Sequence, residues 1–360
     1  MSNSFNRGEW SEIYAILSML LCPKLSIGNA ELEEITNELY NLKKIRIDDP
    51  NSNGIIEYAL NNRNDVQVFY DNELDVLISK LELSENKHRL FEAINNAPAG
   101  NGSFAIQGID GILAKLTKGQ TIKSKSFNKQ DLEATIADKR LGRDVELKYS
   151  IKSSLGSPAT LLNASQHTNF LYSIEGLDCK YIDTINNIDT RTKLLDRIKF
   201  IENHGGKIHF EKICDDTLNY NLKMIDSNMP KYLANVLLNS YLTDKKDLVE
   251  LFKNSNQFED ETFALKKLGD FLEGISFGFF PSKKWDGIKQ VNGGLVIVKN
   301  NGNVVILDLI YFRNEVVKYL MKETKLDSPS SSRYNMLKLF QLDLDDKIYF
   351  TLNLQVRYKK

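Results

Sequence analysis

Residues 131–153 read DLEATIADKRLGRDVELKYSIKS, and this stretch decides the fold that we expect. On both sides of its middle, apolar residues alternate with polar ones, which is the pattern of a β-strand with one buried face. Residues 139–144 hold one glycine and four charged side chains, a composition typical of a turn. The stretch therefore predicts an antiparallel hairpin that turns about Leu141 and Gly142.

The polar face of this hairpin carries acids and lysines. Pairing the strands about the predicted turn sets Asp131 opposite Lys152, and it sets Glu133 opposite Ser150. A metal-dependent phosphodiesterase needs acids that bind the metal and a cation beside the phosphate. A solvated sheet face with cross-strand ion pairs, each worth about 0.2–1 kcal/mol, explains the same pattern. Both interpretations are open on this stretch alone.

The composition limits the class of protein. A chain of 360 residues with 42% hydrophobic and 26% charged residues is ordinary for a globular protein of one or two domains. No apolar run approaches the ~18 residues of a membrane span. The start, MSNSFNRGEW, lacks a signal-peptide core, so we expect a cytoplasmic protein. Three scattered cysteines, and four histidines without a zinc-motif spacing, argue against a disulfide framework and a zinc motif.

The first predicted helix, residues 9–21, carries one acid among apolar neighbours. Glu12 is followed at helical spacing by Ala15, Ile16 and Met19. A carboxylate on a helix that is apolar nearly all round is unfavourable unless it is paired or bound to a cation. A glutamate near an exposed helix start is the alternative.

The remaining periodicities predict a mixed α/β protein. Helices are expected at residues 30–43, 72–97, 108–116, 190–203, 216–256 and 315–324, and a second hairpin is expected about residues 300–303. The final strand should set Asn353, Gln355 and Arg357 on one face. A change of character near residue 275 predicts two parts. Residues 1–275 would hold the N-terminal helices, the hairpin and a helical region, and residues 276–360 would be rich in strands.

Two stretches around the hairpin suit contact with a nucleic acid. Residues 115–152 hold ten Lys or Arg against five Asp or Glu in a chain of net charge −1, and a basic loop with Lys125 and Lys129 leads into Asp131. Residues 155–170 carry no acidic or basic side chain apart from one histidine, and they are rich in Ser, Thr, Asn and Gln. Such side chains bind phosphates or reach base edges. A solvated loop is the alternative for the basic stretch.

Five separated groups of motifs, spread over most of the chain, resemble the HpaII-type restriction endonucleases within the broader PD-(D/E)XK nuclease fold. Any one of them is weak, but five in the right order argue against a chance resemblance. They are RGEWSEIY at 7–14; GILAKL at 111–116 with KSKSFNKQDL at 123–132; YSIKSSLGSPATLLNASQHTNF at 149–170; FLEGISFG at 271–278 with WDG and GGLVIVK; and FRNE, YLMKETKLDSPSSSRY and LNLQVRY between 312 and 358.

The resemblance implies a restriction-endonuclease-like α/β core, in which Asp131 is the metal-binding acid and Lys152 is the lysine at the end of the next strand. The second acid of this fold lies two residues before that lysine, where this chain has Ser150. Ser150 is therefore a departure from the family fold's catalytic pattern.

Two explanations of this departure remain. The acid–x–lysine motif is shifted to Glu146 and Lys148, or the lysine is Lys152 and the acid comes from elsewhere. The predicted register favours Lys152, because Asp131 lies opposite it. It then nominates Glu133, across from Ser150, and Glu12, from the first helix, as further metal ligands and catalytic residues.

The resemblance further implies Mg²⁺-dependent cleavage of double-stranded DNA at a short palindrome, CCGG for the founding member, leaving a 5′-phosphate and a 3′-hydroxyl. A homodimer and a cognate DNA methyltransferase are the expected partners. A structure-specific repair or recombination nuclease, and a DNA-binding protein with a decayed nuclease centre, are the alternatives. The side chains expected to contact DNA are Lys125, Lys129, Thr160, Asn163, Ser165, Asn169, Lys283, Lys284, Arg313, Ser331, Arg333, Gln355 and Arg357.

Overall fold

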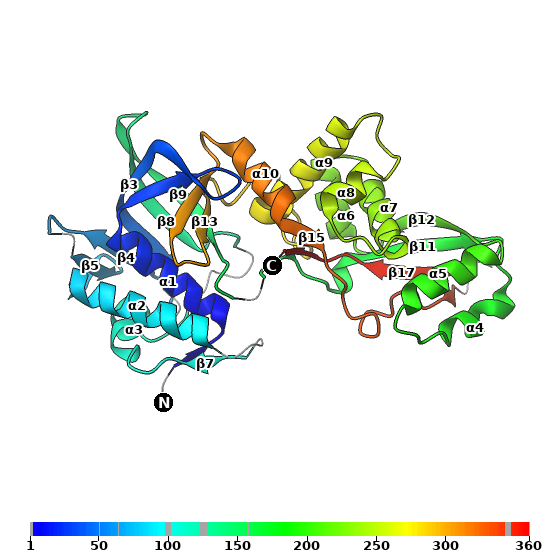
Figure 1. Cartoon of the computed structure of the whole chain (residues 1–360), viewed down its shortest axis with the longest axis horizontal. Coiled ribbons are helices and arrows are strands. Elements are labelled where there is room, and N and C mark those ends of the chain that lie inside the picture. The colour runs from blue at the N-terminus through cyan, green and yellow to red at the C-terminus, as the bar shows by residue number, and fades with distance from the viewer. Residues whose placement is uncertain are drawn as a thin grey trace. The chain divides into compact units, whose positions relative to one another are not determined.

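The computed structural model describes residues 3–49, 51–63, 65–97, 102–122, 128–156, 158–342 and 347–359. They form two compact units that alternate along the chain (Figure 1). The first unit is built from the chain up to residue 159 and from residues 289–319; the second is built from residues 160–288 and 320–359. Each unit thus takes residues from both sides of position 275. The expected division into a part of residues 1–275 and a strand-rich part of residues 276–360 stays a prediction.

A nine-stranded sheet is the centre of the first unit. Its strands are β2 (Lys24–Gly28), β3 (Glu34–Asp48), β4 (Ile55–Leu60), β5 (Val66–Tyr70), β6 (Glu73–Ile78), β8 (Leu132–Asp138), β9 (Arg143–Ser153), β13 (Gly294–Val298) and β14 (Val304–Asp308). Their order is β2-β14-β13-β9-β8-β3-β4-β5-β6. β3, β8 and β9 pair antiparallel, whereas β13 runs parallel to β9. The sheet is therefore mixed, as expected for an α/β protein.

The first helix of this unit packs its apolar stripe against the sheet. α1 (Arg7–Leu21) begins at a capping box, in which the Asn6 side chain accepts from the backbone N–H of Glu9 and the Glu9 carboxylate accepts from that of Asn6. Trp10, Ile13 and Leu17 are buried. α1 lies beside α2 (Lys80–Asn96) in Figure 1. The helix expected at residues 9–21 is confirmed. The unit also holds β1 (Ser4–Phe5), β7 (Phe104–Ala105), α3 (Asp110–Thr117) and the first part of α10 (Arg313–Glu323).

The helix expected at residues 30–43 is wrong, because residues 34–48 form β3. Tyr40 and Leu42 are buried two positions apart, and so are Ile45 and Ile47. Between these two pairs, the register with β8 shifts from Leu42 to Lys44. That irregularity breaks the period of two, and the sequence pattern then imitates helical spacing. Pairing with β4 and β8 on its two sides fixes the segment as a strand.

Several other expected elements are confirmed with altered bounds. Residues 72–97 begin with strand β6, and the helix α2 starts only after its N-cap Ser79. The hairpin about residues 300–303 is confirmed by the pairing of β13 with β14. The helix expected at 216–256 is divided into α6 (Asp216–Ile225), α7 (Met229–Leu242) and α8 (Leu248–Lys253). No helix of the described residues is long and apolar enough to cross a bilayer.

The second unit holds two small sheets beside a group of helices (Figure 1). One sheet has the order β12-β11-β17-β16 and the other β10-β18-β15. Its strands are β10 (Thr160–Leu162), β11 (Asn169–Glu175), β12 (Lys207–Ile213), β15 (Thr324–Leu326), β16 (Phe340–Gln341), β17 (Ile348–Asn353) and β18 (Val356–Tyr358). The further helices are α4 (Ile182–Asn186), α5 (Lys193–Asn203) and α9 (Glu261–Glu273), and a one-turn 3₁₀-helix spans Gln166–Thr168.

The single final strand expected from the sequence is wrong. β17 ends at Asn353 and β18 begins at Val356, and the two strands belong to different sheets. Asn353 is fully buried, whereas the Nε atom of Arg357 lies 3.4 Å from a carboxylate oxygen of Asp327. Asn353 and Arg357 therefore do not form one polar row on one strand.

Candidate active site

The hairpin of β8 and β9 pairs two residues away from the expected register. Glu133 faces Lys148, and Leu132 faces Tyr149. The turn holds residues 139–142, because the Asp138 carboxylate accepts from the backbone N–H groups of the second and third residues after it, at 2.8 and 3.2 Å. The expected pairing of Glu133 with Ser150 is therefore wrong. A shift of two leaves every side chain on its predicted face, since the strand period is two.

Asp131, Ser150 and Lys152 form one chain of polar contacts at the end of the hairpin. The Asp131 carboxylate accepts from the Ser150 hydroxyl at 2.9 Å and from the Ile151 backbone N–H at 2.6 Å. Lys152 Nζ donates to Ser150 Oγ at 2.7 Å and to the Ile151 carbonyl at 2.9 Å. Ser150 is 3% exposed. The serine hydroxyl thus joins the acid to the lysine, which the sequence had placed on one face without this bridge.

Glu12 of α1 lies in the electrostatic field of the same cluster. Burial raises the pKa of the Glu12 carboxyl well above its usual value, and the charge of Asp131 raises it further, whereas Lys152 lowers it. Two carboxylates in a poorly solvated place are stable only if they share a proton or bind a cation. The tertiary fold places Glu12 beside the hairpin, so it is not the exposed helix-start glutamate that the sequence left open.

Lys129 belongs to this cluster as well. Burial and the positive charge of Lys152 lower the pKa of Lys129 to about 7, while the charge of Asp131 acts in the opposite direction. Its backbone N–H donates to the side-chain oxygen of Gln290 at 2.7 Å. The sequence predicted Lys129 as a DNA-binding residue of a basic loop. The structure places it beside the acid and the lysine of the hairpin.

Glu133 and Glu146 are held by an arginine. Arg46 lies 3.4 Å from the Glu133 carboxylate, 3.0 Å from that of Glu146 and 2.7 Å from that of Glu57. Glu133 therefore shares one guanidinium with two other acids and has the longest of the three contacts. A small pocket of about 90 Å³ brings Glu133 and Asp131 together, and its walls also include Arg46, Ile47, Asp48, Ile55, Gln130 and Leu132.

The carboxylates at this site suit a hard divalent cation. Among the described residues, no group of three or more His, Cys, Asp or Glu side chains could hold a metal ion by itself. Mg²⁺ keeps several waters and needs only one or two protein carboxylates together with a substrate phosphate. Burial and the charge of Asp131 raise the pKa of Glu12, so the two carboxylates of Asp131 and Glu12 fit such an ion.

Most of the residues expected to contact DNA lie in the second unit. Lys129 and Arg313 lie in the first unit, and Lys125 lies outside the described residues. The exposed members of the set are Asn163, Lys283, Lys284, Arg313 and Arg333, and the partly buried ones are Lys129, Thr160, Ser165, Asn169, Ser331, Gln355 and Arg357.

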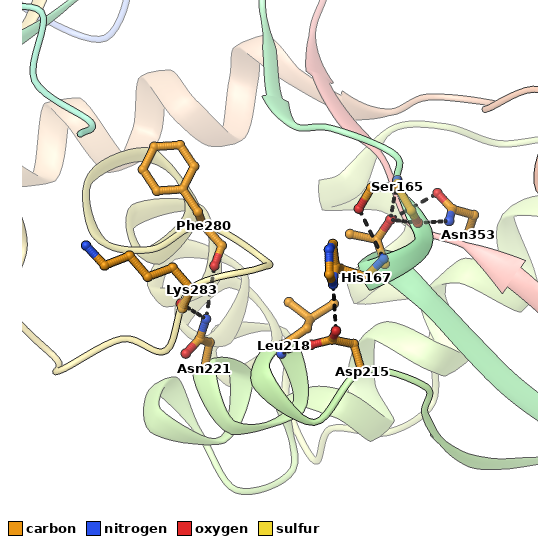
Figure 2. A network of polar contacts seen from close by, with 9 residues as sticks. Ser165, His167, Asp215, Leu218, Asn221, Phe280, Lys283 and Asn353 are labelled. Atoms are coloured by element: carbon orange, nitrogen blue, oxygen red, sulfur yellow. Dashed lines mark hydrogen bonds and ion pairs between the residues drawn. The ribbon is translucent and has the colours of Figure 1, made fainter. Parts of the chain in front are cut away.

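His167 and Asp215 were not among the expected site residues. Their side chains meet at 2.6 Å, from His167 Nδ1 to Asp215 Oδ2 (Figure 2). Asp215 directly precedes α6 and could have been recognised as its N-cap from the sequence. Its contact with a histidine 48 positions away has no sequence signal.

Comparison with known proteins gives a consistent result. The family model described as HpaII restriction endonuclease matches residues 6–358. The Type II restriction enzyme HpaII of Haemophilus parainfluenzae is 33% identical over 365 aligned positions, which cover 99% of this chain and 98% of the relative. No solved structure matches.

Proposed function

We propose that this chain, which belongs to the HpaII restriction endonuclease family and is a site-specific deoxyribonuclease, hydrolyses DNA at the cluster around Asp131. The observation that carries this assignment is the contact chain from Asp131 through Ser150 to Lys152. An acid and a lysine joined in this way bring a metal-binding group and a cation to one scissile phosphate.

We further propose that the first unit is a PD-(D/E)XK core. The support is its mixed sheet, in which an acid precedes β8 and a lysine lies near the end of β9. Ser150 stands at the position of the usual second acid. Glu12, whose carboxyl lies in the field of Asp131, is the acid that we assign in its place. Glu133, which the sequence nominated, contacts Arg46 at 3.4 Å instead.

Asp131 and Glu12 are the residues that would hold Mg²⁺, the cofactor we propose. When bound, the ion lowers the pKa of a water molecule and offsets negative charge on the scissile phosphate. Lys152 has three N–H donors, and two of them are used by Ser150 and the Ile151 carbonyl. The third donor has no partner in the described part of the chain, and we assign it to orient the attacking water or to stabilise the phosphate oxygens. Lys129 adds a second basic group beside the same phosphate.

The hydrolysis transfers a water oxygen to phosphorus and breaks the bond from phosphorus to O3′. The fragments carry a 5′-phosphate and a 3′-hydroxyl. We propose that recognition is the task of the second unit, on a short palindrome such as CCGG, and that a homodimer reads both halves. A cognate DNA methyltransferase is the partner we expect in the same cell, since an active endonuclease would otherwise cut its own host.

Digestion of a long plasmid with Mg²⁺ tests this function directly. Discrete fragments with a common end sequence are expected. A smear, or cutting restricted to branched DNA, would instead indicate a structure-specific nuclease. Binding of DNA without cleavage in Mg²⁺ or Mn²⁺ would indicate a decayed centre.

Lys152→Ala and Lys148→Ala form a matched pair that tests the choice of lysine. Lys152 contacts Ser150, whereas Lys148 faces Glu133 across the hairpin. Removing one electrostatic donor from an active site costs about 10²–10³ in rate. We therefore expect Lys152→Ala to lose at least a hundredfold in single-turnover cleavage and Lys148→Ala to stay within tenfold of the unaltered protein. A larger loss of cleavage in Lys148→Ala than in Lys152→Ala would place the catalytic acid–x–lysine motif at Glu146 and Lys148.

A further inference from the structure

One helix of the second unit is tied to two loops by its own polar side chains (Figure 2). At its N-terminus, one Asp215 carboxylate oxygen accepts from the Leu218 backbone N–H at 3.0 Å, and the other lies 2.6 Å from His167 Nδ1. Two turns along α6, the buried Asn221 side chain donates to the carbonyls of Phe280 and Lys283 at 3.1 and 2.9 Å. α6 therefore holds the loop of residues 165–168 and the loop of residues 280–285 in fixed places.

The loop around His167 is held from its other side by a buried asparagine. Asn353 Nδ2 donates to the Ser165 carbonyl and to Asn169 Oδ1, both at 2.7 Å, and Asn353 Oδ1 accepts from the Thr168 hydroxyl at 3.0 Å. Ser165 Oγ accepts from the His167 backbone N–H at 3.2 Å. Ser165 and Asn169 brace this loop, and their expected contact with DNA stays a prediction. Two other side chains of the braced loop reach the surface: Gln166, which is exposed, and His167, which is partly buried.

The contact with Asp215 decides which nitrogen of His167 carries its proton. Burial raises the pKa of Asp215, but hydrogen bonds from His167 and from the Leu218 backbone outweigh it and hold that pKa below its ordinary value. Asp215 is therefore a carboxylate, which can only accept, so Nδ1 donates. In the neutral ring, Nε2 is then an acceptor. It has no hydrogen-bond partner in the described part of the chain, and the side chain is 33% exposed.

We propose that His167 reads a base in its neutral form: its Nε2 accepts a hydrogen bond from the exocyclic amino group of cytosine or adenine in the major groove, and Asp215 is the positioning residue that fixes this tautomer. The proposal rests on the function proposed above, because only a sequence-specific enzyme needs such a contact. In the major groove, N4 of cytosine and N6 of adenine are the donors that a single acceptor can read. The loop on the other side of α6 carries the exposed Lys284, whose Nζ lies 4.4 Å from the centre of the Tyr220 ring, and we expect this lysine to contact a phosphate.

His167→Ala tests the base contact by binding rather than by cleavage. Competition binding is measured on duplexes that carry the target found by digestion and on duplexes that each differ from it by one base pair. We expect discrimination at one base pair in each half-site to fall about tenfold or more, with an unchanged dependence on salt. Lys284→Ala should instead weaken binding to all duplexes alike. It should also lower by about one the slope of the logarithm of the binding constant against the logarithm of the salt concentration. His209→Ala is the matched control, since His209 also lies beside a carboxylate, Glu175, at 3.3 Å.

Asp215→Asn separates base reading from structure. Asparagine is as good an N-cap as aspartate, so α6 should remain intact. Its amide N–H₂ would donate to Nδ1 and move the ring proton to Nε2, which turns the acceptor into a donor. We expect thermal stability close to that of the unaltered protein and the same loss of discrimination as in His167→Ala.

Unchanged discrimination in either variant overturns the proposal. A reduced salt slope in His167→Ala would make the histidine a phosphate contact instead, and would overturn it as well. Once digestion has given the target, the binding assay itself measures no cleavage. A failure here is therefore distinguishable from a failure of the catalytic assignment, which appears as retained cleavage in Asp131 variants.

Discussion

Asp131→Asn is expected to reduce single-turnover cleavage by about 10³-fold or more. One carboxylate oxygen of Asp131 accepts both from the Ser150 hydroxyl and from the Ile151 N–H. The amide oxygen of asparagine can take that position, so the local structure should persist while the negative charge is lost. In buffer without Ca²⁺, the affinity of this variant for target DNA should equal or exceed that of the unaltered protein, because the negative charge of Asp131, which repels phosphate, has been removed.

Glu133→Gln is the control for this prediction. Glu133 lines the same pocket as Asp131, but it contacts Arg46 at 3.4 Å. We expect cleavage by Glu133→Gln within tenfold of the unaltered protein. An equal loss in the two variants would make Glu133 the missing acid and would remove Glu12 from that role. Retained cleavage in Asp131→Asn would show that the centre lies elsewhere.

Glu12→Gln should abolish cleavage and, without divalent cations, stabilise the fold. Burial and Asp131 both raise the pKa of Glu12, so its charged form is unfavourable in the folded protein. A neutral amide of the same size removes this penalty. We expect the free energy of unfolding at neutral pH to rise by about 1–3 kcal/mol, measured by urea denaturation in EDTA. Cleavage should fall by about 10³-fold, since the site loses a ligand.

The pH dependence of this gain has a definite sign. A group whose pKa is higher in the folded state contributes stability below its unfolded pKa and loses that contribution as the pH rises through its folded pKa. Glu12 therefore destabilises the folded, unaltered protein as the pH rises towards neutral. At a pH below the usual pKa of a glutamate, near 4.5, it has no such destabilising effect. The difference in unfolding free energy between Glu12→Gln and the unaltered protein should grow with rising pH and vanish in acid.

Titration with Mg²⁺ completes the test. An ion that binds only the folded state raises stability with its concentration. The unaltered protein should gain stability from millimolar Mg²⁺, and Glu12→Gln should gain little. Equal stabilisation of both proteins, or full activity in the variant, would contradict the assignment of Glu12 as a metal ligand.

Local pattern was sufficient for the faces of the hairpin and insufficient for its register. Alternation placed Asp131, Ser150 and Lys152 on one polar face, and the structure keeps them there. The pairing depends on where the turn begins, which Asp138 decides by capping two backbone N–H groups. The same limit applies to β3, where a register irregularity concealed the strand period.

The sequence by itself determined the family, the hairpin and the acid and lysine on its polar face, because these depend on residue order and on a period of two. The tertiary structure decided which groups surround them. Burial and approach across the fold brought Glu12 and Lys129 to Asp131, paired Glu133 with Arg46, and set Asp215 against His167. Desolvation and charge proximity arise between segments far apart in the chain, so no local pattern contains them.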